Sequence, residues 1–116
     1  QAIELFDKEN YDASLTLLNK VITSDPQNAY ALYYRGMIYD AKNNYNGAIN
    51  DYKKALSANQ TPDLAVVNYL IAVDYDNLKQ WANSKTYYQN FINSYSTDDE
   101  YKQYAQTRIE ELKNIK

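Results

Sequence analysis

Residues 29–58 read AYALYYRGMIYDAKNNYNGAINDYKKALSA. In both halves of this stretch, apolar residues recur three and four positions apart, which is the spacing of an amphipathic helix. The polar residues Asn43 and Asn44 interrupt the pattern between the halves. The stretch therefore predicts two helices, over about residues 27–42 and 45–58, joined by a short turn.

The same pattern recurs on both sides of this stretch. Tyr45 aligns with Tyr11, 34 positions earlier, and with Trp81, 36 positions later. Small and bulky residues recur in step at Ala2, Gly36 and Ala72; at Leu5, Tyr39 and Tyr75; at Ser14, Ala48 and Ser84; and at Leu18, Tyr52 and Tyr88. A period near 34 is the length of a helix-turn-helix unit that stacks on copies of itself. Small residues such as Gly36 and Ala48 allow antiparallel helices to approach closely.

Further helices are predicted outside the central pair. They cover residues 1–8 (the end of a helix), 11–22, 62–79, 81–95 and 98–115. The apolar face of the helix over residues 11–22 is expected to be Tyr11, Leu15, Leu18, Val21 and Ile22. The stripe of the last helix is expected to be Tyr101, Ala105, Ile109 and Leu112. Few residues break these helices, so the fold class is all-α.

Capping motifs mark the starts of three of these helices. Asp25 with Pro26 is expected to begin the helix over residues 27–42. Thr61, followed by Pro62 and Asp63, is expected to begin the next one. The last helix follows Thr97–Glu100, which has the T-x-x-E pattern of a capping box.

Composition limits the class of function. The chain of 116 residues has a net charge of -3 and a pI near 4.8, which gives no support to nucleic-acid binding. It contains no cysteine and no histidine, so it lacks the usual thiolate nucleophile, the commonest general base and most transition-metal ligand sets. Asp98, Asp99 and Glu100 form the densest acidic cluster and are better explained as a helix cap. We expect no enzymatic activity, no metal site and no cofactor.

The compartment stays open at this point. No apolar run approaches the roughly 18 residues that span a bilayer, and no signal peptide is visible. Gln1 already lies in helical sequence and no Met precedes it, so we interpret the sequence as a fragment or a processed chain. A soluble, cytoplasmic protein is the default expectation, and an exported one stays open because a targeting segment could lie upstream.

The repeating residues resemble the tetratricopeptide repeat family, whose pattern is W-x2-L-G-x2-Y followed by A-x3-F and A. The best match is Leu32, Arg35, Gly36 and Tyr39, followed by Ala48, Tyr52 and Ala55. The resemblance covers residues 1–96 and implies a right-handed superhelical stack of antiparallel helix pairs. We expect a single domain over residues 1–116, with about two and a half repeats: a partial repeat 1–26, repeats 27–60 and 61–96, and a capping helix 97–116.

Repeat three departs from the family pattern. Asn68 takes its Trp position, Lys85 stands where the other copies have Leu15 and Ile49, and Phe91 fills a position that is small in the other copies. A bulky residue there suits a junction with a non-repeat capping helix.

The resemblance implies a binding groove lined by the first helix of each repeat, which holds a peptide or a partner helix. Repeat two would contribute Tyr30, Tyr33, Tyr34, Met37 and Asp40; repeat three Val66, Tyr69, Val73, Asp76 and Asn77; and repeat one Ile3, Phe6 and Asp7. Asp40 stacked over Asp76 would form an acidic column, so the expected partner carries aromatic or apolar anchors and a basic residue. Tyr33 and Tyr69 stand where a clamp for a terminal carboxylate needs basic residues, which argues against that subtype.

Two alternatives remain for these features. The 14 tyrosines could reflect compositional bias, with those of the groove merely covering helix surfaces. The chain could also be an assembly segment that self-associates or stacks on further repeats through Ala2, Ile3, Leu5 and Phe6 at its open end. The sequence names neither the partner nor the number of repeats.

Overall fold

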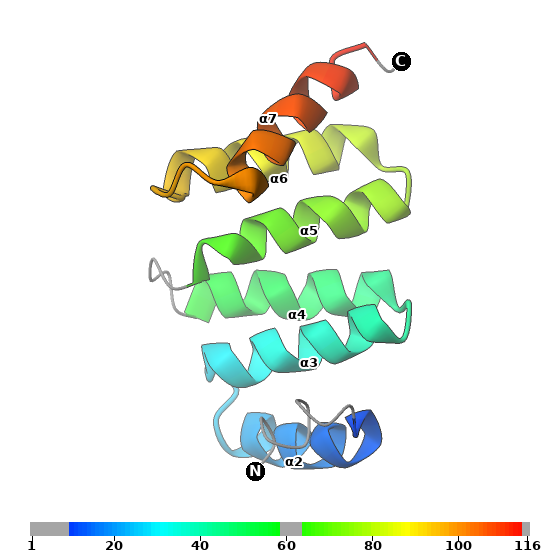
Figure 1. Ribbon diagram of the computed structural model, residues 1–116. Coiled ribbons are helices and arrows are strands. Elements are labelled where there is room, and N and C mark those ends of the chain that lie inside the picture. Colours follow the sequence, from blue (N-terminus) through cyan, green and yellow to red (C-terminus); the bar gives the residue numbers. More distant parts are fainter. Residues whose placement is uncertain (1–9, 59–63, 115–116) are drawn as a thin grey trace. The chain divides into compact units, whose positions relative to one another are not determined.

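The computed structural model describes residues 10–58 and 64–114, which contain helices and no strand. The six helices are α2 (Tyr11–Ser24), α3 (Ala29–Ala41), α4 (Tyr45–Ala58), α5 (Val66–Asn77), α6 (Trp81–Ser94) and α7 (Glu100–Leu112) (Figure 1). The predicted all-α fold is confirmed. The helix end expected at residues 1–8 and the helix start expected at residues 61–63 lie outside the described residues.

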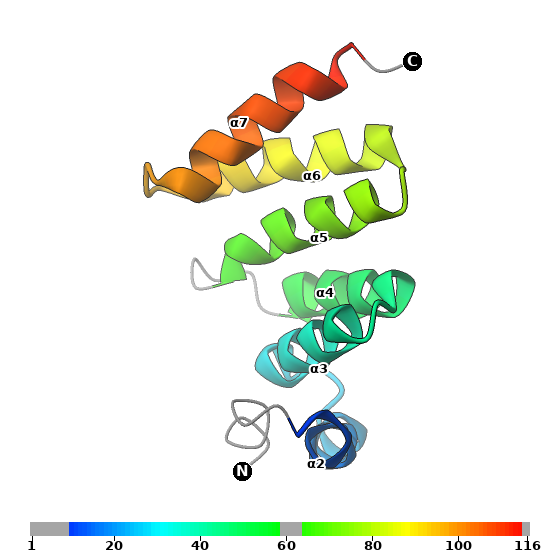
Figure 2. The same cartoon turned by 45° about the vertical axis from the view of Figure 1, so that its right-hand side comes forward.

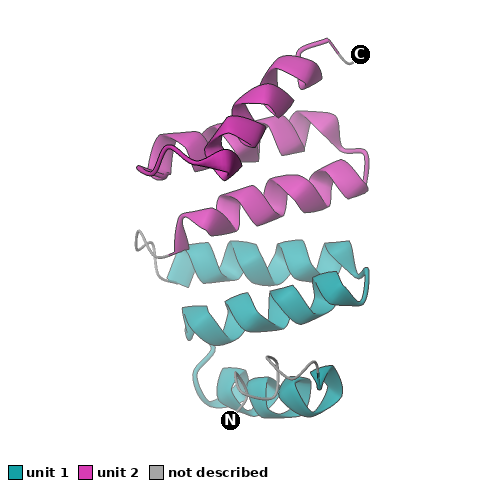
Figure 3. Cartoon of the chain, viewed as in Figure 1, with its two compact units in different colours: residues 1–59 teal, residues 60–116 magenta. Residues whose placement is uncertain are grey.

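The helices belong to two compact units, residues 1–59 and 60–116 (Figure 3). In unit 1, α3 packs against both α2 and α4. In unit 2, α6 packs against both α5 and α7, and α7 lies on α6 at an inclination to it (Figure 2). Among the described residues, each unit therefore holds one helix pair of the predicted kind and one additional helix, α2 in unit 1 and α7 in unit 2.

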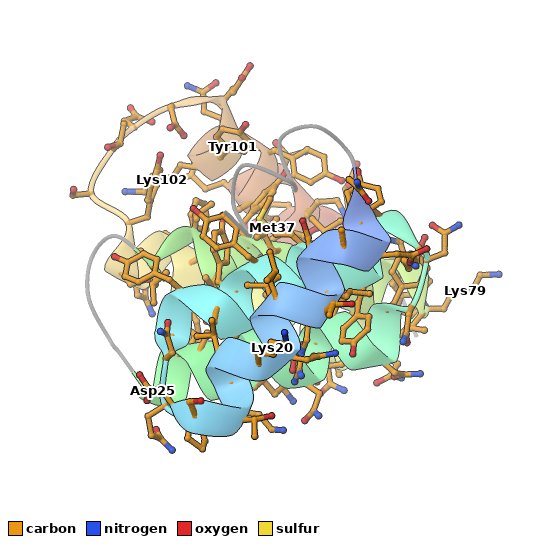
Figure 4. All side chains as sticks on the ribbon, turned by 90° about the horizontal axis from the view of Figure 1, so that it is seen from below. Lys20, Asp25, Met37, Lys79, Tyr101 and Lys102 are labelled. Carbon is orange, nitrogen blue, oxygen red and sulfur yellow. The ribbon has the colours of Figure 1, made fainter. Side chains whose placement is uncertain are left out.

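The turns inside the two helix pairs have the same conformation. Asn43 between α3 and α4 has φ 62°, and Lys79 between α5 and α6 has φ 60°. The amide of Asn44 donates to the carbonyl of Tyr39 at 2.8 Å, and the amide of Gln80 donates to the carbonyl of Tyr75 at 2.9 Å. Left-handed residues with such hydrogen bonds end helices by satisfying their last carbonyls. Lys79 extends away from its turn toward the edge of the view in Figure 4.

Close contact between α3 and α4 explains why position 36 is a glycine. A Cβ atom on Gly36 would lie 2.6 Å from Cε1 of Tyr52, closer than carbon atoms can approach. Tyr52 is fully buried, so its ring cannot move aside into solvent. The expectation that small residues mark close helix packing is therefore confirmed here.

We expect Gly36→Ala to lower the free energy of unfolding by about 1–3 kcal/mol, because overpacking outweighs the better helix propensity of alanine. Gly47→Ala is the matched control, since the atoms nearest to its Cβ belong to the exposed side chain of Asn44. That side chain can move aside at the cost of one hydrogen bond from the Gly47 amide, so the loss should be smaller than for Gly36→Ala. Urea unfolding followed by circular dichroism measures both variants. Equal losses for the two substitutions would contradict this account of Gly36.

Each unit has its own apolar cluster. In unit 1, Leu18, Ala31 and Ile38 are buried together. The cluster of unit 2 joins α5, α6 and α7 through Ala72, Tyr88, Phe91, Ala105, Ile109 and Leu112. Phe91 is thus buried against the last helix, as its bulk at a small-residue position predicted. Of the tyrosines that recur in step along the repeats, Tyr52, Tyr75 and Tyr88 are buried, whereas Tyr11, Tyr39 and Tyr45 are half-buried.

Two predicted caps are wrong. Helix α3 begins after Asn28, whose side chain accepts a hydrogen bond from the amide of Ala31 at 3.0 Å; Asp25 lies three residues too early. Helix α7 begins after Asp99 and not after Thr97. Asp99 Oδ1 accepts from the amides of Tyr101 and Lys102, which agrees with the interpretation of the acidic cluster as a helix cap. In both places, neighbouring polar residues compete for the cap, and the backbone conformation selects one of them.

Two residues predicted on apolar faces are exposed instead. Val21 in the last turns of α2 is 38% exposed, and Tyr101 in the first turn of α7 is 47% exposed. Tyr101 nevertheless makes a ring contact with Tyr69 of α5, with centroids 5.4 Å apart.

Candidate functional site

One face of α3 carries most of the residues predicted to line a groove in repeat two. Tyr30, Tyr33, Met37 and Asp40 follow one another at helical spacing. Tyr30 is 43% exposed, and the other three are half-buried. Met37 is labelled in Figure 4. The surface therefore combines aromatic and thioether side chains with a single carboxylate.

Tyr34 has a different environment from the other predicted groove residues. Its ring lies 5.3 Å from the ring of Tyr33 and also packs against the apolar cluster shared by α2 and α3. Much of its surface is therefore used inside unit 1. The groove residues predicted from repeat one, Ile3, Phe6 and Asp7, lie outside the described residues, as do Ala2 and Leu5 of the assembly alternative.

The carboxylate of Asp40 is bound to the neighbouring helix. The hydroxyl of Tyr52 in α4 donates a hydrogen bond to Asp40 Oδ2 at 2.6 Å. The Tyr33 ring lies 6.3 Å from the Tyr52 ring. Asp40 Oδ1 is buried and has no hydrogen-bond partner among the described residues. We call Tyr33, Asp40 and Tyr52 the first triad.

The same arrangement occurs in unit 2, 36 residues later. The hydroxyl of Tyr88 donates to Asp76 Oδ2 at 2.6 Å, and the Tyr69 ring lies 6.1 Å from the Tyr88 ring. We call Tyr69, Asp76 and Tyr88 the second triad. The repeat thus reproduces a polar contact as well as apolar packing, and the family pattern did not predict this contact.

Helix α7 covers the second triad. The Tyr69 ring lies 5.4 Å from that of Tyr101 and 6.1 Å from that of Tyr104. Arg108 binds Asp76 through two hydrogen bonds, from Nε to Oδ2 at 3.1 Å and from Nη2 to Oδ1 at 3.0 Å. The charge of Asp76, expected to contribute to an acidic column, is therefore balanced inside unit 2.

The other groove residues predicted from repeat three have mixed environments. Val66 and Val73 are half-buried and pack, with Tyr69, against the apolar cluster of unit 2. Asn77 is exposed at the end of α5. Sequence reasoning missed Arg108 and Tyr104. The available signal was the spacing of Tyr101, Tyr104 and Arg108, which places all three along one side of a helix.

Burial and the hydrogen bond to Asp76 raise the pKa of the Tyr88 hydroxyl well above its ordinary value of 10.0. A raised pKa in the folded state means that folding favours the protonated hydroxyl. The corresponding stability is fully present below about pH 10 and decreases as the pH rises further, because unfolded tyrosine then ionises.

We expect Tyr88→Phe to lower the free energy of unfolding by about 1–3 kcal/mol at neutral pH, since a hydrogen bond to a charged group is lost. The variant should also lose less additional stability than the native chain between about pH 8 and about pH 11. Urea titrations at both pH values measure how much unfolding free energy each protein loses between them. If Tyr88→Phe loses as much unfolding free energy at alkaline pH as the native chain does, Tyr88 does not cause that loss.

A depression lies in unit 1, between α2, α3 and α4. It has a volume of about 410 Å³ and is lined by Ile22, Pro26, Gln27, Leu32, Arg35, Asn50, Lys53, Lys54 and Ser57. The Arg35 guanidinium is already bound by Asp51 and by Asn19. The most buried cation of this cavity is therefore already paired.

Residues 10–58 and 64–114 contain no group of three or more His, Cys, Asp or Glu side chains that could hold a metal ion. Across the same residues, no helix combines the length and the apolar character needed to cross a membrane.

Several solved structures have the same fold. The Yersinia enterocolitica type III secretion chaperone SycD, in complex with a peptide of the translocator YopD, is 14% identical, with 97% of this chain and 86% of that chain covered and a TM-score of 0.81. The first tetratricopeptide repeat domain of Spaghetti (RPAP3), bound to the HSP90 peptide SRMEEVD, is 16% identical, with coverage of 97% and 88% and a TM-score of 0.83. The Sgt2 tetratricopeptide repeat domain from Aspergillus fumigatus is 16% identical, with coverage of 97% and 74% and a TM-score of 0.79.

Sequence comparison gives the family directly. None of the curated proteins matches the chain significantly. Two models described as tetratricopeptide repeat match it, one over residues 29–62 and the other over residues 67–98. The first match contains α3 and α4, and the second contains most of α5 and all of α6. With more than half of its residues matched and with helix pairs in both units, this chain belongs to the tetratricopeptide repeat family.

Proposed function

We propose that the chain is a non-catalytic protein-interaction module that binds a peptide or a helix of a partner protein on the α3 surface formed by Tyr30, Tyr33, Met37 and Asp40. One observation carries this proposal: aromatic and apolar side chains, including the 43% exposed Tyr30, lie along one helix face beside a carboxylate. Aromatic side chains anchor interfaces because they bury a large area at little cost in rotamer entropy.

The similar structures support the same mode of action. SycD holds a peptide of YopD, and the Spaghetti domain holds an HSP90 peptide. Identities of 14% and 16% do not carry ligand specificity across. We propose a partner chosen by this surface, with aromatic or apolar anchors and a basic residue opposite Asp40.

Tyr69, Val73, Asp76 and Asn77 are proposed as a secondary part of the binding surface. Tyr69 and Asp76 already contact α7, so they have less surface and less charge to offer to a partner. We therefore assign the main anchors to α3.

Selection of displayed linear peptides on the immobilised chain tests this function. Peptides selected by the native chain should bind Tyr30→Ser/Met37→Ser at least about tenfold more weakly, because apolar anchors dominate such interfaces. Val21→Ser is the matched control, since Val21 is an exposed apolar residue of α2 in the same unit. Equal binding to all three proteins would contradict recognition by α3. Circular dichroism must show unchanged helicity in both variants.

A further inference from the structure

The two triads have the same internal geometry but different surroundings. In the second triad, Asp76 accepts hydrogen bonds from Tyr88 and from Arg108 at the same time. In the first triad, Asp40 accepts one from Tyr52, and its Oδ1 has no hydrogen-bond partner among the described residues. The second triad therefore shows what the first can bind, because a tyrosine hydroxyl and a guanidinium share one carboxylate there.

An unpaired carboxylate oxygen that is buried is costly, since it loses its hydration without a replacement. The two triads are 36 residues apart, so the position equivalent to Arg108 for the first triad lies 36 residues before it. That position is Ala72, which has no side-chain donor. Tyr101 and Tyr104 correspond in the same way to Ala65 and Asn68. The repeat that follows the first triad thus lacks the arginine that α7 supplies to the second.

We propose that the first triad is a binding site for an arginine side chain of the partner protein, and that Arg108 occupies the equivalent site of the second triad as an internal ligand. The proposal rests on the proposed function. The proposal specifies which residue the partner contributes. It also excludes Asp76 as a second arginine site in the native chain, because Arg108 already binds Asp76 there. The partner guanidinium donates to Asp40 Oδ1 and Oδ2 while Tyr52 keeps its hydrogen bond.

Arginine suits this site better than lysine. Asp76 is bound by two nitrogen atoms of one planar guanidinium, and an ammonium group cannot reproduce that pair of bonds in a fixed plane. Because Asp40 Oδ1 is buried in the free chain, binding requires a side-chain rearrangement at the α3 surface. Such rearrangements are common at interfaces.

The test uses peptides selected on the native chain by display, each synthesised with arginine and with citrulline, which has the same shape but no charge. Affinities are measured by fluorescence anisotropy against the native chain, Asp40→Asn and Asp25→Asn. Asparagine at position 40 still provides an acceptor for Tyr52. Asp25→Asn makes the same charge change in the exposed turn between α2 and α3, where Asp25 is labelled in Figure 4.

We expect the selected peptides to share an arginine, and both citrulline and Asp40→Asn to weaken binding about tenfold or more. Combining the two changes should weaken binding no further, and Asp25→Asn should bind as the native chain does. Peptides that depend on Tyr30 and Met37 but tolerate citrulline would overturn this inference and leave the proposed function standing. A selection that yields no peptide dependent on α3 would overturn both.

Discussion

Arg35→Leu is expected to lower the free energy of unfolding by about 3–5 kcal/mol, because it leaves the carboxylate of Asp51 buried without its counter-ion. Asp51 is 1% exposed. Arg35 binds it through two hydrogen bonds, from Nε to Oδ2 at 2.7 Å and from Nη2 to Oδ1 at 2.8 Å. A third hydrogen bond, from Nη1 to Asn19 Oδ1 at 3.0 Å, connects α3 to α2. Urea unfolding measures the loss.

A double substitution distinguishes the effect of the unpaired charge on stability from the effect of the changed side-chain packing. Arg35→Leu/Asp51→Leu should recover much of the stability lost by Arg35→Leu, since apolar residues can replace a buried pair with little cost. Removal of the exposed pair between Lys42 and Asp12 by Asp12→Ala should change stability little. If Arg35→Leu lowers the free energy of unfolding no more than Asp12→Ala does, the pair between Arg35 and Asp51 does not stabilise the unit.

The helices could be predicted because periodic residues determine them. Helix α4 begins at Tyr45 and ends at Ala58, as its apolar spacing predicted. The pattern placed Arg35 at a position that is leucine in the family, but it could not show that a buried aspartate would bind it. Asp51 lies on another helix, and such a pairing depends on how the helices pack.

The candidate site was predictable only in part, for the same reason. The α3 surface follows from helical spacing and from the family resemblance. The occupation of the second triad does not, because Asp76 and Arg108 are 32 residues apart and meet only when α7 packs on its unit. A cap such as Asn28 also escapes the pattern, since several adjacent polar residues can serve that role.

Phe91→Ala should lower the free energy of unfolding by about 3–5 kcal/mol, although it restores the small residue found at this position in the other repeats. Phe91 is fully buried, and its ring lies 4.6 Å from that of Tyr95 and 5.3 Å from that of Tyr69. In the same cluster it packs with Ile109 and Leu112 of α7. Alanine would leave a cavity between α6 and the helix that supplies Arg108.

Hydrogen exchange locates this loss. Amides of α7 should exchange faster in Phe91→Ala, whereas amides of α3 should keep more of their protection, because the cavity lies in unit 2. Ile92→Ala is the control, since Ile92 is only half-buried against the same cluster and should cost less. If Phe91→Ala costs no more than Ile92→Ala, or if α3 loses protection as much as α7 does, Phe91 does not hold the last helix in place. If α7 alone is released, Arg108 also leaves Asp76, and the second triad becomes a second arginine site that the native chain lacks.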